Sequence, residues 1–130
     1  MANIAVVDDD PEVLDFITLT LNGAGHQTVT ARDGLATIPL VENNAVDLLI
    51  LDILMPNRDG LETIMTLRRE GKAFPILAIS AGGMLDGGYL LKTARAFGAD
   101  DILHKPFTPD GLLTAVTRLL AGERQTAEAG

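Results

Sequence analysis

The sequence contains no cysteine and few aromatic residues, with one tyrosine and four phenylalanines among 130 residues. The absence of cysteine excludes disulfides, thiolate metal sites and thiol chemistry. Aromatic residues make up 4% of the chain and apolar residues 47%, so the buried core is expected to be aliphatic.

Basic residues are also scarce, since 10 Lys and Arg stand against 18 Asp and Glu, for a net charge of −8. Such an acidic chain is repelled by phosphate backbones, so we expect no nucleic-acid partner. A divalent cation or a basic protein surface is the more natural partner.

No apolar run is long enough to span a bilayer, and the first seven residues carry no basic side chain of the kind that opens a signal peptide. We therefore expect a soluble, cytoplasmic protein with no membrane association. The length suits one compact domain, which we place at residues 1–122. The small and polar residues 123–130 are expected to form a disordered tail.

Five short apolar runs alternate with longer amphipathic stretches, a pattern typical of strands alternating with helices. The runs predict strands over residues 4–7, 27–30, 46–51, 75–79 and 102–104. The amphipathic stretches predict helices over residues 11–23, 34–43, 61–70, 89–97 and 109–120. Such alternation implies an α/β fold with a parallel, doubly wound sheet covered by helices on both faces.

Local signals mark where several of these elements begin and end. Asp10 and Thr108 are predicted N-caps, and each precedes a proline at the first helical position. Asp33 is the predicted cap of the second helix, which Pro39 should kink or shorten. Residues 82–88 include four glycines and are expected to form a flexible loop.

Polar side chains follow the ends of four predicted strands. The first strand is followed by three aspartates, Asp8 to Asp10, and the third ends at Asp52. Ser80 ends the fourth strand, and Lys105 follows the fifth. Doubly wound sheets bind ligands at the carboxyl ends of their strands, so we expect these side chains to converge on one crevice.

Each of these residues also has a simpler interpretation when taken alone. The three aspartates could be a polar strand end with a helix cap, and Asp52 could simply end a buried strand. Ser80 could be a turn residue, and Lys105 could be a solvated surface lysine. Their joint order and shared position at strand ends favour a functional site over four separate coincidences.

Charge indicates what such a site could do. Carboxylates close together in a partly desolvated crevice repel one another, and a hard divalent cation such as Mg²⁺ relieves that repulsion. A lysine opposite them can hold a phosphoryl oxygen, and a carboxylate can act as the nucleophile toward a phosphoryl group. The cation and the lysine would neutralise charge on the group in transfer.

Six motifs occur in a fixed order at or near the predicted strand ends. They are Val6-Val7-Asp8-Asp9-Asp10-Pro11, Asp47-Leu48-Leu49-Ile50-Leu51-Asp52-Ile53-Leu54-Met55-Pro56, Asp59-Gly60, Pro75-Ile76-Leu77-Ala78-Ile79-Ser80-Ala81, Phe97-Gly98-Ala99-Asp100 and Lys105-Pro106-Phe107. Together they resemble the receiver domains of two-component response regulators, and the likeness covers roughly residues 3–121. The resemblance implies a stand-alone receiver with a flavodoxin-like (β/α)5 fold and the strand order 2-1-3-4-5.

The resemblance also implies a role for each acidic residue of the site. Asp52 would be the phosphoryl acceptor and would contribute to the Mg²⁺ site. Asp9 would bind Mg²⁺ directly, and Asp8 would hold it through water. The backbone carbonyl of Leu54 would be a further ligand.

Two other residues match the family's phosphoryl-binding positions. Ser80 matches the switch hydroxyl that turns inward to bond the phosphoryl group, and Lys105 matches the lysine that binds it. The peptide bond between Lys105 and Pro106 is expected to be cis, as it is in the family.

The sequence departs from the family pattern at three places. The position three residues before the lysine is usually aromatic and moves with the switch hydroxyl, but here it is Ile102. The loop over residues 81–88 is longer and richer in glycine, and we expect it to be ordered only by phosphorylation or by a partner. The third departure is Pro39, which is unusual within the second helix. His104, next to the lysine, is expected to be a partly exposed histidine at a strand end.

The resemblance implies a phosphorylation switch rather than an enzyme acting on outside substrates. A histidine kinase or phosphotransfer protein would donate to Asp52 with Mg²⁺ present. The surface of the fourth helix, fifth strand and fifth helix would then change and control a downstream protein partner. We expect no DNA-binding output domain, and a monomer or weak dimer.

Two alternatives remain open on the sequence. A non-switching interaction module is favoured mildly by Ile102 and by the altered loop, whereas the intact Asp9, Asp52 and Lys105 argue against it. A phosphatase for an external substrate is disfavoured, because no Asp-x-Asp pair surrounds residue 52.

Overall fold

The computed structural model of the chain describes residues 2–53, 60–80 and 87–122. Its strands are β1 (Asn3–Val7), β2 (Gln27–Ala31), β3 (Leu48–Asp52), β4 (Ile76–Ser80) and β5 (Asp101–His104). Its helices are α1 (Pro11–Gly23), the 3-10 turn η1 (Gly34–Ala36), α2 (Thr37–Glu42), α3 (Gly60–Arg69), α4 (Gly87–Phe97) and α5 (Pro109–Leu120).

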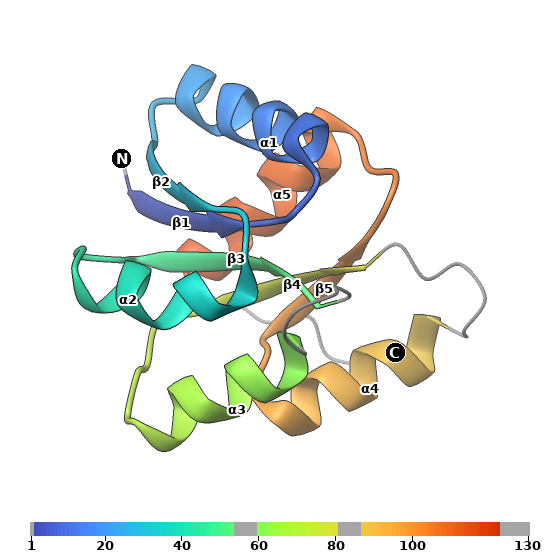
Figure 1. Cartoon of the computed structure of the whole chain (residues 1–130). Helices are drawn as coiled ribbons and strands as arrows, with labels where there is room; N and C mark the ends of the chain where they lie inside the picture. The colour runs from blue at the N-terminus through green and yellow to red at the C-terminus, as the bar shows by residue number, and fades with distance from the viewer. Residues whose placement is uncertain (1, 54–59, 81–86, 123–130) are drawn as a thin grey trace.

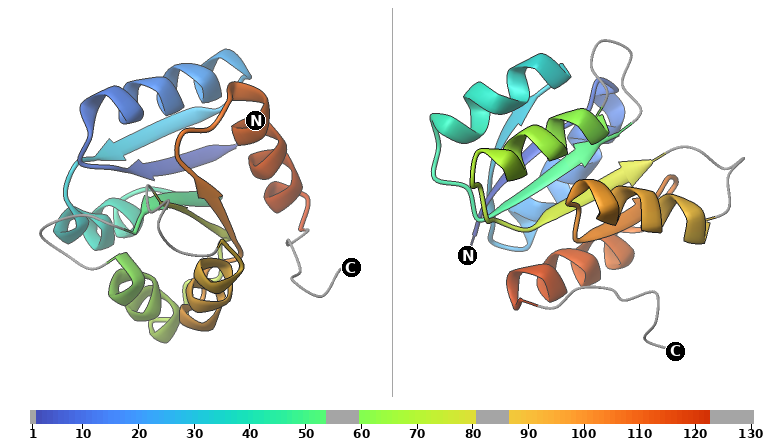
Figure 2. Two further views of the ribbon diagram at one scale, coloured as in Figure 1. Left: turned by 90° about the vertical axis from the view of Figure 1, so that its right-hand side faces the viewer. Right: turned by 90° about the horizontal axis from the view of Figure 1, so that it is seen from below.

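All five strands are parallel and form one sheet in the order β2-β1-β3-β4-β5. Helices α1 and α5 cover one face of this sheet, and α2, α3 and α4 cover the other (Figures 1 and 2). The predicted fold class and strand order are therefore confirmed.

Two clusters of buried aliphatic side chains fill the space between the sheet and its two helical layers. Side chains alternate along the central strand β3, so Leu49 and Leu51 pack beneath α2–α4 whereas Leu48 and Ile50 pack beneath α1 and α5. Every residue of β3 is buried, as expected for a central strand covered on both faces. The expectation of an aliphatic core is confirmed.

The predicted caps of α1 and α5 are present. The Asp10 side chain accepts a hydrogen bond from the Glu12 N–H at 2.9 Å, and Thr108 Oγ1 accepts one from the Gly111 N–H at 2.9 Å. Proline opens both helices, at a position whose N–H has no partner within a helix.

The second helical segment is divided in two. Asp33 caps it through a hydrogen bond from the Leu35 N–H at 2.8 Å, but the first turn is the 3-10 turn η1 and only six residues form α2. Pro39 is the reason, because its ring would clash with the carbonyl of Leu35 in a continuous α-helix. The predicted shortening by Pro39 is confirmed.

The prediction of a glycine-rich loop over residues 82–88 is wrong at its end. Helix α4 begins at Gly87, so Gly87 and Gly88 are helical. Glycine costs a helix only about 1 kcal/mol relative to alanine, and packing of the following turns can offset that cost. Residues 81–86 of the expected loop and the expected tail 123–130 lie outside the described residues.

A single arginine joins α3 to the turns that begin β4 and β5. The Arg68 guanidinium lies 2.9 Å from the Asp100 carboxylate and donates to the carbonyls of Gly98, Lys72 and Phe74 at 2.8–2.9 Å. The same Asp100 oxygen accepts the N–H of Ile76, the first residue of β4, at 2.9 Å. These contacts fix the starts of the two strands that end at Ser80 and His104. We call them the Arg68 clasp.

Among the helices that the structure describes, none is both long and apolar enough to cross a membrane.

Candidate functional site

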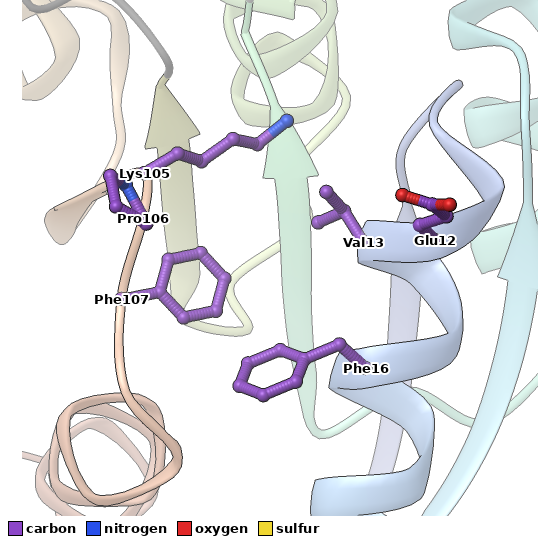
Figure 3. A pocket seen from close by; sticks show the side chains of 6 residues that line it. All are labelled: Glu12, Val13, Phe16, Lys105, Pro106 and Phe107. Carbon is purple, nitrogen blue, oxygen red and sulfur yellow. The ribbon is translucent and has the colours of Figure 1, made fainter.

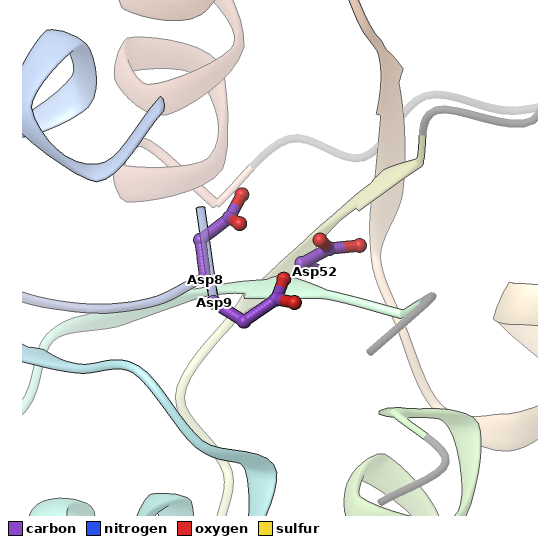
Figure 4. Close-up of side chains that lie close together, drawn as sticks. All are labelled: Asp8, Asp9 and Asp52. Atoms are coloured by element: carbon purple, nitrogen blue, oxygen red, sulfur yellow. The ribbon is translucent and has the colours of Figure 1, made fainter. Parts of the chain in front are cut away.

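The carboxyl ends of β1 and β3 bring three carboxylates together (Figure 4). Asp8 and Asp9 directly follow β1, and Asp52 is the last residue of β3. One carboxylate oxygen from each lies within 4.8 Å of the other two. The predicted convergence of these side chains is therefore present.

The three carboxylates differ in their access to water. Asp8 has no exposed surface and Asp52 is 3% exposed, whereas Asp9 is exposed. Two ionised carboxylates 4.8 Å apart repel by roughly 3 kcal/mol at an effective dielectric constant of about 20. The fold holds Asp8 and Asp52 close despite this repulsion because they lie at the ends of the adjacent paired strands β1 and β3.

Asp8 is fixed by the start of helix α1. Its Oδ1 accepts a hydrogen bond from the Asp10 N–H at 2.9 Å, and its own N–H donates to the Ala31 carbonyl at 3.2 Å. Its other oxygen, Oδ2, is buried and lies 3.0 Å from Lys105 Nζ. That oxygen is a buried ligand atom of the acidic cluster whose counter-charge is the lysine ammonium.

Lys105 supplies the positive charge of the site. Its Nζ forms ion pairs with Asp8 Oδ2 at 3.0 Å and with Asp52 Oδ2 at 3.1 Å, where it also donates a hydrogen bond. Its backbone N–H donates to the Ser80 carbonyl at 2.8 Å, which ties it to the end of β4. The peptide bond between Lys105 and Pro106 is cis, as predicted.

These contacts shift the ionisation of two groups in the cluster. Burial raises the pKa of Asp8, although the Asp10 N–H and Lys105 act in the opposite direction. Burial alone would lower the pKa of Lys105, but its contacts with Asp8 and Asp52 outweigh burial, so the pKa is raised. Lys105 therefore stays protonated beside the carboxylates.

The predicted switch residues lie on β4 and β5. Ser80 is fully buried at the end of β4, and its neighbour Ile79 is paired in register with Asp52. Ile102 is 8% exposed and belongs to the buried cluster that includes Ala94 of α4. His104 is exposed, and Leu54 lies outside the described residues.

The residues present fit a divalent cation. Three carboxylates offer hard oxygen ligands, which Mg²⁺ prefers, and the one positive charge of Lys105 balances only part of their negative charge. Asp9 is exposed to water, and Mg²⁺ usually keeps several water ligands. Asp8, Asp9 and Asp52 could therefore hold such an ion.

Sequence reasoning did not identify an apolar groove beside this cluster. The groove has a volume of about 510 Å³ and is lined by Glu12, Val13, Phe16, Lys105, Pro106 and Phe107. The rings of Phe16 and Phe107 lie beside each other at a tilt of 52°, with centroids 5.7 Å apart, and Lys105 extends from the groove toward the end of β3 (Figure 3). The helical spacing of Val13 and Phe16 indicated that the two residues share one face of α1. It could not predict that Phe107 would lie beside them.

A second feature missed from the sequence is the role of Gly60, the first residue of α3. A Cβ added there would lie 2.5 Å from Ile53 Cα and 2.9 Å from the Asp52 carbonyl oxygen. Only glycine therefore allows α3 to begin directly against the strand end that carries Asp52.

The comparisons with known proteins agree on one family. The sequence matches the family described as "Response regulator receiver domain" over residues 4–117. It is 38% identical over 117 residues to the response regulator MprA of Mycobacterium sp. (strain KMS), a match that covers 90% of this chain and 50% of that protein. The chain spans about half the length of the curated relatives it matches.

Solved structures give the same answer. The receiver domain of the Francisella response regulator 1452 superposes with a TM-score of 0.85 at 29% identity, covering 94% of this chain and 98% of that one. The chemotaxis protein CheY4 of Vibrio cholerae superposes with a TM-score of 0.83 at 29% identity, covering 92% and 98%.

Proposed function

This chain belongs to the response regulator receiver domain family, and from that membership we propose that it is a phosphoryl-accepting signalling switch whose acceptor is Asp52. The observation that carries the proposal is the pairing of Lys105 Nζ with Asp52 Oδ2 at 3.1 Å within a cluster of three carboxylates. A carboxylate that could act as the nucleophile, oxygens that could hold a cation and a positive charge thus lie together at the strand ends.

In the proposed reaction, an Asp52 carboxylate oxygen attacks the phosphorus of a phosphohistidine on a histidine kinase or phosphotransfer protein. The new O–P bond forms as the P–N bond to the imidazole breaks, and the imidazole nitrogen keeps the electron pair. Asp8, Asp9 and Asp52 would hold Mg²⁺, which supplies charge neutralisation for the transferred group. Lys105 would stabilise the same charge with its ammonium group.

The signal would leave through β5 and α4. Ser80 and Lys105 are tied by a backbone hydrogen bond at 2.8 Å, so an inward movement of either would displace the end of β5. Ile102 on β5 packs in the same buried cluster as Ala94 of α4. We propose that phosphorylation changes the α4–β5–α5 surface through this path and so controls a protein partner.

The apolar groove is the proposed docking position of the phosphodonor protein. Lys105 lines the groove and also contacts Asp52, so a helix seated on Phe16 and Phe107 would bring its histidine to the acceptor. Exposed Glu12 lines the α1 side of the groove, and exposed Asp15 lies on the same helix. The fitting partner is an amphipathic helix whose apolar stripe is flanked by basic residues.

The acceptor assignment is tested by intact-mass measurement after incubation with Mg²⁺ and phosphoramidate, a small donor that needs no docking. The wild-type chain is expected to gain the mass of one phosphoryl group, and Asp52→Asn is expected to gain none. If Asp52→Asn still gained that mass, Asp52 would not be the phosphoryl acceptor.

The docking assignment needs a second donor. Phe16→Ala is expected to slow transfer from a phosphorylated kinase that labels the wild-type chain by tenfold or more, which corresponds to about 1.4 kcal/mol, while labelling by phosphoramidate stays unchanged. Leu35→Ala, an exposed leucine on η1, is the matched control. Equal loss with both donors would mean that Phe16 supports the site rather than the docking.

A further inference from the structure

Helix α3 contacts the acceptor strand at one end and the base of α4 at the other. At its start, a Cβ on Gly60 would lie 2.9 Å from the Asp52 carbonyl oxygen and 2.5 Å from Ile53 Cα, so no space separates the helix from the peptide that carries Asp52. At its end, the Arg68 clasp binds the turns that precede β4 and β5. Closely packed elements move together, so a shift of the Asp52 peptide would be passed along α3 to the clasp.

The guanidinium of Arg68 joins two turns that could otherwise move apart. Its Nη1 donates to the carbonyls of Lys72 and Phe74, in the turn between α3 and β4, at 2.8 Å. Its Nε donates to the Gly98 carbonyl and its Nη2 to the Asp100 carboxylate, both at 2.9 Å and both in the turn between α4 and β5. A guanidinium is planar and rigid, so a shift of one turn relative to the other lengthens the bonds on one side of the clasp.

The packing of α3 against α4 leaves the clasp little freedom to adjust. Gly98 lies against the stem of Arg68, since a Cβ added there would be 2.5 Å from Arg68 Cγ. Ile64 of α3, Ala94 of α4 and Ile102 of β5 belong to one buried cluster. Ile102 is only 8% exposed, so little of it remains to be moved inward. A change of the α4–β5 surface therefore needs a movement of α4 against α3, which the clasp resists.

We propose that the Arg68 clasp is an autoinhibitory contact, which holds α4 and β5 in their unphosphorylated position and loosens when Asp52 is phosphorylated. The inference rests on the proposed function for the phosphorylation of Asp52. It adds that α3 connects the acceptor to the clasp, and that the clasp sets how readily the switch is turned on. A restraint and a ligand that favour opposite forms of a protein weaken each other by the same factor. Removal of the clasp therefore strengthens the binding of a phosphoryl mimic.

The inference is tested by calorimetric titration of the full chain with beryllofluoride, which mimics a phosphoryl group, at saturating MgCl₂. Arg68→Met removes the guanidinium and keeps the aliphatic stem, so it is expected to bind the mimic at least about fivefold more tightly than wild type. Arg69→Met, at the exposed neighbour on the same helix, changes the net charge equally and should bind within about twofold of wild type. Circular dichroism at the titration temperature establishes that each variant is folded.

A clasp that only supports the fold gives a different result. Its loss would leave the affinity for the mimic unchanged or lower, and either outcome in Arg68→Met would overturn the inference. The proposed function would survive that result, because wild type would still bind the mimic at Asp52. If wild type and both variants failed to bind the mimic, the proposed function and the inference would fail together.

A measurement on the unmodified chain keeps the inference testable if Arg68→Met does not fold. The Nε–H of Arg68 is expected to give a distinct signal in a ¹H–¹⁵N spectrum, because the Gly98 carbonyl accepts its hydrogen bond at 2.9 Å. Saturation with the mimic should shift this signal and the amides of Gly98 and Asp100, which lie at the opposite end of the sheet from Asp52. If these signals stayed in place while the amides of Asp52 and Lys105 moved, the clasp would not respond to the switch and the inference would be overturned.

Discussion

Replacement of Arg68 by methionine tests the clasp that fixes the starts of β4 and β5. The change removes the guanidinium but keeps the aliphatic stem, which packs against Gly98 so closely that an added Cβ there would lie 2.5 Å from Arg68 Cγ. It therefore deletes the ion pair with Asp100 and the hydrogen bonds to three carbonyls, with little loss of packing.

The magnitude follows from the burial of the two partners. Removing one partner of a buried ion pair costs about 3–5 kcal/mol, because the other charge is left uncompensated. The Asp100 side chain is 8% exposed but that of Arg68 is 23% exposed, so water can reach part of the vacated space and lowers the cost. Asp100 also still accepts the hydrogen bond from the Ile76 N–H, which is 2.9 Å long. When the lost hydrogen bonds to the three carbonyls are included, we expect the free energy of unfolding to fall by about 3 kcal/mol.

Urea unfolding followed by far-ultraviolet circular dichroism measures this loss. With a slope of about 2 kcal/mol per molar urea, the midpoint should fall by about 1.5 M. Arg69→Met, one residue along in the same helix and exposed, is the matched control and should lie within about 0.5 kcal/mol of wild type. Asp100→Asn added to Arg68→Met should restore part of the loss, because it removes the uncompensated charge. A loss below about 1 kcal/mol in Arg68→Met would refute the reasoning.

Two further substitutions probe the acidic cluster itself. Asp8→Asn should raise the melting temperature at pH 7, because burial raises the pKa of Asp8 and so penalises its charged form. The protonated form of Asp8 favours folding below the pKa in the unfolded chain, and that contribution is lost as pH rises through the raised folded pKa, so the advantage of Asn should shrink in scans at lower pH. Gly60→Ala should cost about 2 kcal/mol or more in urea unfolding, since its Cβ would meet Ile53 Cα at 2.5 Å. Gly23→Ala, with no atom within 4 Å of its added Cβ, should cost nothing.

The order of the elements could be predicted from the sequence because local signals and apolar periodicity agreed. The Asp10 and Thr108 caps and the shortening of the second helix by Pro39 depend on neighbours within four residues, and each is present in the structure. Strand ends were less certain, since cross-strand pairing decides them. The predicted strand over residues 46–51 begins at Leu48.

The start of α4 shows where local reasoning fails. Four glycines within residues 82–88 predicted a loop, yet the helix includes Gly87 and Gly88. The intrinsic preference of glycine against helix is about 1 kcal/mol per residue, which tertiary packing can override. Such packing is invisible in a local window of sequence.

The acidic cluster could be predicted because parallel strands bring their carboxyl ends to one edge, whatever their separation in the chain. The contact of Lys105 with two carboxylates at once could not be predicted, since it depends on the path of a long side chain in the folded protein. The groove between Phe16 and Phe107 was likewise hidden, because its walls come from segments about ninety residues apart.

The central claim, that Asp52 is the acceptor of a working switch, is tested most directly by amide NMR during titration with Mg²⁺ and beryllofluoride, a phosphoryl mimic. Shifts are expected to begin at Asp9, Asp52 and Lys105 and to extend along β5 through Ile102 into α4, and Asp52→Asn is expected to show no response to the mimic. Shifts confined to the acidic cluster would contradict the switch and favour a non-switching interaction module, and the absence of any response would contradict the site itself.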